Sequence, residues 1–399
     1  MDDKQEIRLD NWLHTVGFTG NPFSDTEARQ DLHLHEYFVE PACFDTILGT
    51  AVSPRSAVLF APRGGGKTAN CVMVDHFCKI GERIEDNVFS IVYSKFDNLV
   101  GSVEWGTHGV CVHINVHHHV AEVLKRGCVE LLEAFEAHRL SPDSRDEDAR
   151  RSMLRILGTY GCEEEVRRLL ALLPLLGLDS DEGRQLVLQA QKWVQAGQVN
   201  PLRDFRILVA TLVTMGVRAV YVLVDRIDEF HPASFDPMAG ALFLSPLLSH
   251  LSLLDMKHVA FKFFLPSHLK SILLDKGILR PDRLVVEEIV WSDEDLLKTL
   301  HSRLYVFSER QVPTLEPLFL SPQLAKEAER RLVACAEGSP RDLVLACNKL
   351  FATHVQHFLT DEELRIGREA LEKTINVFTS ERTRWRPAPS RRPIGFIPQ

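Results

Sequence analysis

The chain has 399 residues, of which 45% are apolar and 25% charged. This composition is typical of soluble globular proteins and excludes a disordered or fibrous chain. At roughly 100 to 200 residues per domain, the length allows two or three domains. Acidic residues outnumber basic ones by 55 to 46, and the resulting net charge of -9 excludes a general polyanion binder.

The sequence shows no sign of a membrane or secreted protein. The longest apolar run, residues 169–178, is broken by Pro174 and Gly177, and a membrane span takes about 20 residues. The first residues are acidic and polar, unlike a signal peptide. The eight cysteines form no C-x-x-C pair, which argues against a zinc ribbon or a disulfide framework. We therefore expect a cytoplasmic protein with reduced cysteines.

In chain order, residues 1–48 predict a lead-in segment that packs on the domain after it. Short apolar runs typical of strands follow at 56–60, 88–93, 110–116, 219–224, 259–265 and 284–289. Because these runs are continuous and alternate with helical patterns, residues 49–290 predict an α/β domain with a parallel sheet covered by helices. A helical insertion is expected at about 119–200, followed by a helix at 201–214.

The histidines in the middle of this domain raise the question of a metal site. His113 and His117 are four residues apart, and His117, His118 and His119 are consecutive. Only Cys111 lies close enough in sequence to add a further ligand, whereas metal sites usually add several. We prefer to interpret this segment as a solvated junction between a strand and a helix.

After Trp291 the pattern is helical, and residues 291–378 predict a separate helical domain. Ser292 with Asp295, and Thr360 with Glu363, have the spacing of helix N-caps. Residues 379–399 contain five arginines and four prolines. They predict an irregular basic tail.

The strongest chemical signal is the segment A-P-R-G-G-G-K-T at residues 61–68, between a predicted strand and a helix. Such a loop directs backbone N–H groups at phosphate oxygens, with a helix N-terminus behind them. Ala61 replaces the glycine that usually begins this pattern. Lys67 is expected to reach the β- and γ-phosphates of a nucleotide, and Thr68 to bind Mg²⁺. The expected nucleotide-binding residues are Arg63, Gly64, Gly65, Gly66, Lys67, Thr68 and Ala69.

A carboxylate at the end of another predicted strand completes this pattern. Asp225 follows the apolar run at 219–224, where an acidic group is costly unless a cation or strong hydrogen bonds await it. We expect Asp225 to hold Mg²⁺ together with Thr68. Asp228 and Glu229 follow it and can orient an attacking water molecule.

Two further segments point to the terminal phosphate of a nucleotide. In Gly338-Ser339-Pro340-Arg341, the glycine ends one helix and the serine caps the next. Arg341 then lies in a first helical turn, where the helix dipole disfavours a cation and a nearby anion would favour it. Ser267, just after the run at 259–265, is a second candidate for a polar group beside the γ-phosphate.

These residues resemble those of the AAA+ and STAND group of P-loop ATPases. The similarity covers residues 56–351 outside the insertion: the loop at 61–68 resembles a Walker A motif, residues 220–225 a Walker B motif, and G-S-P-R the second sensor of origin-recognition ATPases. Arg226 stands where most AAA+ enzymes have a glutamate. The spacing of Asp225, Asp228 and Glu229 is closer to the NACHT-like STAND pattern. The resemblance implies a nucleotide-binding domain with a helical lid.

The resemblance favours an ATP-dependent switch or assembly ATPase with Mg²⁺ as its cofactor. It would work with separately encoded protein partners in bacterial defence or signalling, and a homo-oligomer is compatible with it. One alternative is a nucleic-acid ATPase of the initiator or transposition-regulator type, which would use the basic tail. Another is a pseudo-ATPase that binds nucleotide without hydrolysing it, because of Arg226. Arg280 and Arg283 are candidates to reach a neighbouring subunit's nucleotide.

Overall fold

The computed structural model describes residues 3–83, 87–106, 109–140, 147–173, 180–229, 234, 236–360 and 362–385. These residues form two compact units. The sheet unit comprises Ala42–Pro62 and Lys67–Ile289, and the helical unit comprises residues 3–41, 63–66 and 290–385. None of the helices within the described ranges is long and apolar enough to cross a membrane.

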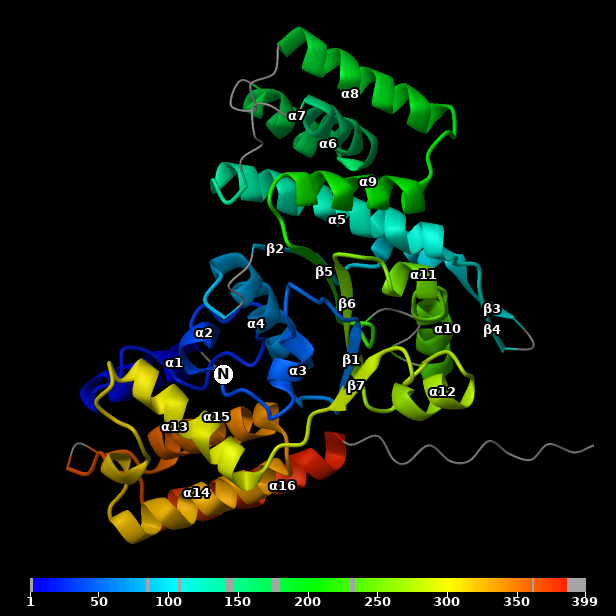
Figure 1. The fold of residues 1–399 in the computed structure, drawn as a ribbon. Helices are drawn as coiled ribbons and strands as arrows, with labels where there is room; N and C mark the ends of the chain where they lie inside the picture. The colour runs from blue at the N-terminus through cyan, green and yellow to red at the C-terminus, as the bar shows by residue number, and fades with distance from the viewer. Residues whose placement is uncertain are drawn as a thin grey trace, which may run out of the picture. The chain divides into compact units, whose positions relative to one another are not determined.

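The sheet unit contains five parallel strands in the order β2-β5-β6-β1-β7 (Figure 1). Their bounds are β1 Ala57–Ala61, β2 Val88–Tyr93, β5 Ala219–Val224, β6 Val259–Pro266 and β7 Val285–Glu288. Strands β1, β5 and β6 are buried along their whole length, as continuous apolar runs require. Five of the six predicted strands agree with these bounds to within one residue at either end, and the predicted α/β fold class is confirmed.

Helices cover both faces of this sheet, as strand β6 illustrates. Phe261 packs on Phe205 of α9 (Pro201–Thr214), with 6.3 Å between ring centroids. The next residue, Lys262, points to the opposite face, where it lies close to Cys78 of α4 (Lys67–Ile80). The other elements outside the insertion are α3 Phe44–Leu48, η1 Asp97–Ser102, α10 Pro237–Leu248, α11 Leu251–Leu254 and α12 Leu269–Asp275.

The described residues between 116 and 195 are largely helical. They form α5 Val116–Glu136, α6 Glu147–Tyr160, α7 Glu163–Leu172 and α8 Ser180–Gln195; residues 141–146 and 174–179 lie outside the described ranges. Figure 1 shows α5 and α9 next to the sheet, with α6, α7 and α8 stacked beyond them. Gly127 allows α5 to approach this closely, because a Cβ there would lie 3.2 Å from Ile91 and 3.4 Å from Leu208.

The predicted strand at 110–116 is wrong in its length and its partner. Strand β4 (Gly109–Val112) ends earlier and pairs antiparallel with β3 (Val103–Gly106), apart from the five-stranded sheet. The extended run stops because Asn115 caps α5, its side chain accepting hydrogen bonds from the backbone of His117 and His118. Helix formation therefore overrides the apolar pattern of Val112–Val116.

The helical unit joins the beginning of the chain to its last helices. Its elements are α1 Asp3–Thr15, α2 Leu34–Tyr37, α13 Asp293–Phe307, η2 Glu316–Leu318, α14 Pro322–Ala336, α15 Pro340–His357 and α16 Arg368–Trp385. Trp12 of α1 packs edge-on against Phe351 of α15, and its indole N–H donates to the carbonyl of Leu364 at 2.9 Å. The prediction that residues 1–48 pack on the domain after them is therefore wrong for residues 3–41, which belong to the C-terminal helical unit.

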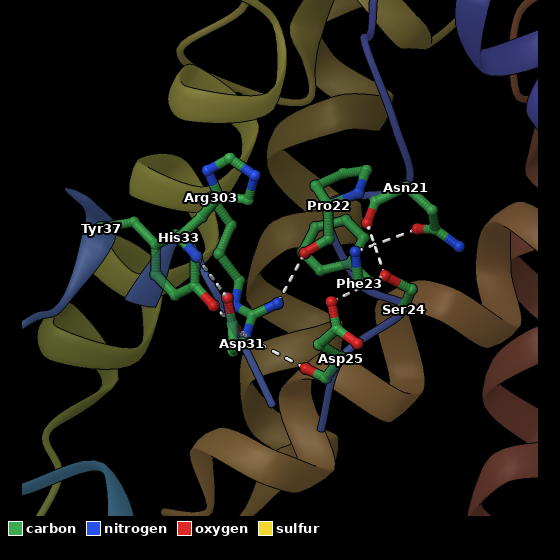
Figure 2. A network of polar contacts seen from close by, with 9 residues as sticks. All are labelled: Asn21, Pro22, Phe23, Ser24, Asp25, Asp31, His33, Tyr37 and Arg303. Carbon is green, nitrogen blue, oxygen red and sulfur yellow. Dashed lines mark hydrogen bonds and ion pairs between the residues drawn. The ribbon is translucent and has the colours of Figure 1, made fainter. Parts of the chain in front are cut away.

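A buried arginine explains why this segment packs on the C-terminal helices (Figure 2). Arg303 of α13 donates to the carbonyls of Pro22 at 2.7 Å and Asp25 at 3.1 Å, and to the hydroxyl of Tyr37 at 2.8 Å. It also forms an ion pair with Asp31 at 3.1 Å and lies over the Tyr37 ring. A guanidinium has five donors in a fixed plane, so it can bind a whole loop of acceptors at once.

Two predictions near the C-terminus also need correction. The hydrogen bond from Glu363 N–H to Thr360 Oγ1 forms at 3.1 Å, but α16 begins only at Arg368. Instead, Ile366 pairs with the chain at Phe319, and this bridge holds the segment extended. Residues 379–385 of the predicted irregular tail are part of α16. The rest of the tail, residues 386–399, lies outside the described residues.

Candidate functional site

The glycine-rich segment connects β1 to α4, as the sequence predicts. Strand β1 ends at Ala61 and α4 begins at Lys67. Gly64 and Gly66 have φ angles of +78° and +91°, which side chains with a Cβ rarely adopt. This backbone conformation allows the sharp turn that precedes the helix. Arg63 is exposed, and Ala69 is half-buried on α4.

In the sheet unit, Lys67 and Thr68 lie next to carboxylates from the end of β5. The Lys67 ammonium forms an ion pair with Asp228 at 3.3 Å, and the Thr68 hydroxyl is 3.5 Å from Asp225 Oδ1. Asp225 is fully buried, and its backbone N–H donates to Tyr93 of β2. The register of parallel strands therefore brings the carboxyl end of β5 to the first turn of α4.

The residue after Asp225 changes the expected role of Glu229. Arg226 has a left-handed backbone, with φ at +67°, and its guanidinium forms an ion pair with Glu229. The Glu229 side chain is 55% exposed, against 25% for Asp228. Of the two carboxylates that the sequence proposed for the attacking water, the structure brings Asp228 to Lys67 and holds Glu229 on Arg226.

The end of β6 places Ser267 differently from what the sequence suggested. The Ser267 hydroxyl donates to Glu288 of β7 at 2.9 Å, and Lys270 binds the same carboxylate at 2.6 Å. The Lys270 ammonium lowers the pKa of Glu288. The Ser267 hydroxyl is therefore engaged by Glu288 of β7.

His268 is the residue that sequence reasoning missed. Burial lowers its pKa, while the charge of Asp228 raises it and that of Lys67 lowers it. The pKa of the His268 imidazole therefore depends on both members of the Lys67–Asp228 pair. Its position two residues after β6, which lies between β1 and β5, was the available signal.

In the helical unit, residues 63–66 pack against the start of α15. The backbone N–H of Arg341 donates to the carbonyl of Gly64 at 3.4 Å, and the Trp291 indole N–H donates to that of Gly65 at 3.0 Å. A Cβ on Gly64 would lie 2.7 Å from Ser339 Oγ and 3.1 Å from Arg341 Cβ. Glycine is therefore required at position 64 by both its φ angle and its neighbours.

The predicted geometry of Gly338-Ser339-Pro340-Arg341 is confirmed. Gly338 has φ at +78°, and the Ser339 hydroxyl accepts a hydrogen bond from Asp342 N–H at 3.2 Å, at the N-cap of α15. Pro340 occupies the first helical position. The Arg341 side chain is exposed in the first turn. Its contact with a phosphate stays a prediction.

The other candidate residues lie elsewhere in the sheet unit. Arg280 is held by both carboxylate oxygens of Asp282 at 3.0 Å, and Arg283 lies 3.7 Å from the same group. Among the histidines, His118 takes part in the N-cap of α5, while His119 is buried between Tyr93 and the carbonyl of Phe243. Burial lowers the pKa of His119 to about 4. Within the described ranges, no group of histidine, cysteine or acidic side chains is arranged to hold a metal ion.

Comparisons with known proteins give a structural similarity but no match by sequence. No family model matches the chain. No curated protein matches it by sequence. The solved structure of the Aeropyrum pernix ORC2 protein in ADPNP-ADP complexes is similar, with a TM-score of 0.41 and 11% identity, over 87% of this chain and 72% of that one. At this level of similarity, the fold assignment rests on the strand order and on the glycine turn between β1 and α4.

Proposed function

We propose that the chain binds ATP with Mg²⁺ and uses it as a molecular switch or assembly ATPase. The observation that carries this proposal is the juxtaposition of Lys67 and Thr68 with Asp228 and Asp225, at 3.3 Å and 3.5 Å. A hydroxyl and a buried carboxylate at this spacing are oxygen ligands of the kind that Mg²⁺ prefers. A lysine beside them suits phosphate oxygens.

The residues of the site have separate expected roles. Backbone N–H groups of the glycine turn and of the first turn of α4 would bind phosphate oxygens, because both carry a partial positive charge. Thr68 and Asp225 would hold Mg²⁺, which neutralises charge on the phosphates when bound. The Lys67–Asp228 ion pair supports a role for Lys67 at the β- and γ-phosphates, since an anion can replace or share the carboxylate.

Asp228 is the best-supported group for orienting the attacking water. It is half-buried, whereas Glu229 is exposed and paired with Arg226. His268 would add a second polar group beside it, because its pKa responds to the charges of both Asp228 and Lys67. Ser267 is less well supported, since its hydroxyl already binds Glu288.

Arg341 is proposed to distinguish ATP from ADP. It lies at an N-terminal helix position that disfavours a cation, so an anion in front of it would lower its free energy. A charged hydrogen bond contributes about 1.5 to 3 kcal/mol, enough to shift a two-state equilibrium roughly ten- to a hundredfold. Separately encoded protein partners, and bacterial defence or signalling as the setting, rest on the family resemblance alone.

Titration with a fluorescent ATP analogue, with and without Mg²⁺, tests the proposal. We expect Lys67→Ala to weaken binding by about tenfold to a hundredfold, because it removes a charged hydrogen bond to phosphate in a buried site. The matched control is Lys125→Ala, which removes an exposed lysine paired with Glu122 on α5. Equal affinity of folded Lys67→Ala and wild-type protein would refute the phosphate-binding role.

The pseudo-ATPase alternative is supported by the Arg226–Glu229 pair, which occupies one of the two candidate carboxylates. Measured turnover separates the two proposals. Saturable ATP binding without any hydrolysis would favour the pseudo-ATPase.

The nucleic-acid alternative would use the arginines of the basic segment. Arg382, one of these arginines, is only 17% exposed and already contacts α14 and the start of α15. DNA binding measured at two salt concentrations tests what is left of the basic segment.

A further inference from the structure

The turn that carries Arg341 is held by an arginine from another helix. Arg382 of α16 donates to the carbonyls of Cys335 and, at 3.3 Å, Ala336, the last residues of α14. The same guanidinium forms ion pairs with Glu337 at 3.1 Å and with Asp342 at 2.9 Å. Its side chain is only 17% exposed. Arg382 therefore binds both sides of the turn between α14 and α15.

This turn has a conformation that needs external support. Glu337 and Gly338 both have left-handed backbones, with φ at +45° and +78°, and this region is unfavourable for a residue with a Cβ. The carbonyls at the end of α14 lack partners within their own helix, and a cation at this end is favourable. Arg382 supplies hydrogen bonds and charge together.

Asp342 connects this support to the neighbouring Arg341. Its backbone N–H is bound by the Ser339 hydroxyl at 3.2 Å, and its carboxylate by Arg382. On the other side of the turn, the backbone N–H of Arg341 donates to Gly64. The backbone that carries Arg341 is thus fixed by Arg382 on one side and by the glycine turn on the other.

We propose that Arg382 is a positioning residue for Arg341: it fixes the turn from Glu337 to Asp342, so that Arg341 can meet the terminal phosphate of ATP. This inference rests on the proposed function of Arg341. It also assigns Arg382 a role within the protein, in place of the contact with nucleic acid that the basic composition of residues 379–399 suggested.

A matched control exists on the same helix. Glu381, the preceding residue, forms an ion pair with Lys349 of α15 at 3.1 Å. Glu381→Gln therefore removes an ion pair between α16 and α15 without removing a contact to residues 335–342. Arg382→Gln removes the ion pairs of the turn, and Arg382→Lys keeps the charge but loses the planar arrangement of donors.

The first test compares the affinities of the full chain for ATP and ADP. We expect Arg382→Gln to lower the ratio of ATP affinity to ADP affinity by about tenfold, because one charged contact becomes mispositioned. The ADP affinity itself should be unchanged. Glu381→Gln should keep the wild-type preference, and Arg382→Lys should fall between them. Arg341→Ala should lose the preference as well, and the double variant should lose no more than Arg341→Ala alone. Additive losses in the double variant would overturn the proposal.

The second test needs no nucleotide, so it separates this inference from the proposed function. Amide hydrogen exchange of the free protein should be faster at residues 337–342 in Arg382→Gln and unchanged there in Glu381→Gln. If exchange is faster but wild-type protein binds no ATP, the proposed function fails while the structural role of Arg382 stands. If exchange at the turn is the same in Arg382→Gln and wild type, the positioning role is wrong.

Discussion

Each of the two units contains a buried cation. The two cations are equally buried but differ in how many protein groups they contact. Arg303 in the helical unit and Lys67 in the sheet unit are each 7% exposed. Arg303 binds two carbonyls, a hydroxyl and a carboxylate, and lies over an aromatic ring. In the described part of the chain, the ion pair of Lys67 is with Asp228 alone, at 3.3 Å.

This difference separates a cation that builds the fold from one that is available to a ligand. A buried charge is costly unless hydrogen bonds satisfy its donors. The contacts of Arg303 engage both of its terminal nitrogens with acceptors of the protein. An ammonium has three donors, and the single ion pair of Lys67 leaves room for phosphate oxygens. The number of contacts that each cation makes within the protein, rather than its burial, therefore distinguishes the two roles.

The largest expected effect is on Arg303. Arg303→Met should lower the free energy of unfolding by about 3 to 5 kcal/mol, because it leaves Asp31 buried without its partner. Urea unfolding followed by circular dichroism measures this. Arg368→Gln is the control, since Arg368 forms an exposed ion pair with Glu327 that should contribute at most about 1 kcal/mol. A loss below about 1 kcal/mol for Arg303→Met would mean that the network does not hold the N-terminal segment.

A third buried cation, Lys262, should behave in the opposite way. It is 1% exposed, and its ammonium donates to the carbonyl of Arg55 at 2.8 Å and lies over the Tyr221 ring. Burial lowers its pKa to about 7. The folded protein therefore binds fewer protons than the unfolded chain between pH about 7 and the ordinary lysine pKa of about 10.4, so stability rises with pH in this window.

Below pH about 7 the cost of burying Lys262 is complete, so replacing it there should be favourable. We expect Lys262→Met to raise the free energy of unfolding at pH 6 by about 2 to 4 kcal/mol, and by less at pH 9. Urea unfolding of both proteins at the two pH values checks this. A gain that does not depend on pH would contradict the proton-linked explanation.

The next effect separates the two carboxylates after Asp225. If ATP is hydrolysed, Asp228→Asn should lower turnover by about tenfold or more, because a positioned base contributes at least that much. Glu229→Gln should change it by less than about threefold, since Glu229 is exposed and paired with Arg226. Turnover at saturating ATP is the measurement. A larger loss in Glu229→Gln would mean that Arg226 releases Glu229 when nucleotide binds.

The smallest expected effect is on the stability of the Lys67 variant. Lys67→Met should change the free energy of unfolding of the nucleotide-free protein by less than about 1 kcal/mol, since Asp228 is a quarter exposed and can be hydrated. A loss as large as that of Arg303→Met would make Lys67 a structural cation and remove the contrast between the two units.

Several features of the candidate site were predictable because they depend on neighbouring residues. The glycine turn at 64–66, the strand that ends before Asp225 and the N-cap at Ser339 are all set by local backbone preferences and by apolar runs. Parallel pairing of those runs was then sufficient to bring Asp225 to Thr68.

The errors involve partners that the local sequence does not specify. Ser267 follows a strand as predicted, but Glu288 from β7 takes its hydroxyl. Thr360 forms its local hydrogen bond, but pairing of Ile366 with Phe319 delays the helix. Composition assigned Arg382 to a basic tail, while its acceptors lie on α14 and α15.

The sequence by itself determined the class of the sheet unit, the glycine turn at residues 64–66 and the acidic strand end, because helices, strands and turns are set by contacts within a few residues. Only the tertiary structure decided which charges are satisfied. The acceptor that Arg303 finds on Pro22 lies 281 residues away, and that of Arg382 on Cys335 lies 47 residues away. Sequence patterns show that a side chain is charged, whereas packing decides which groups surround it when water is removed.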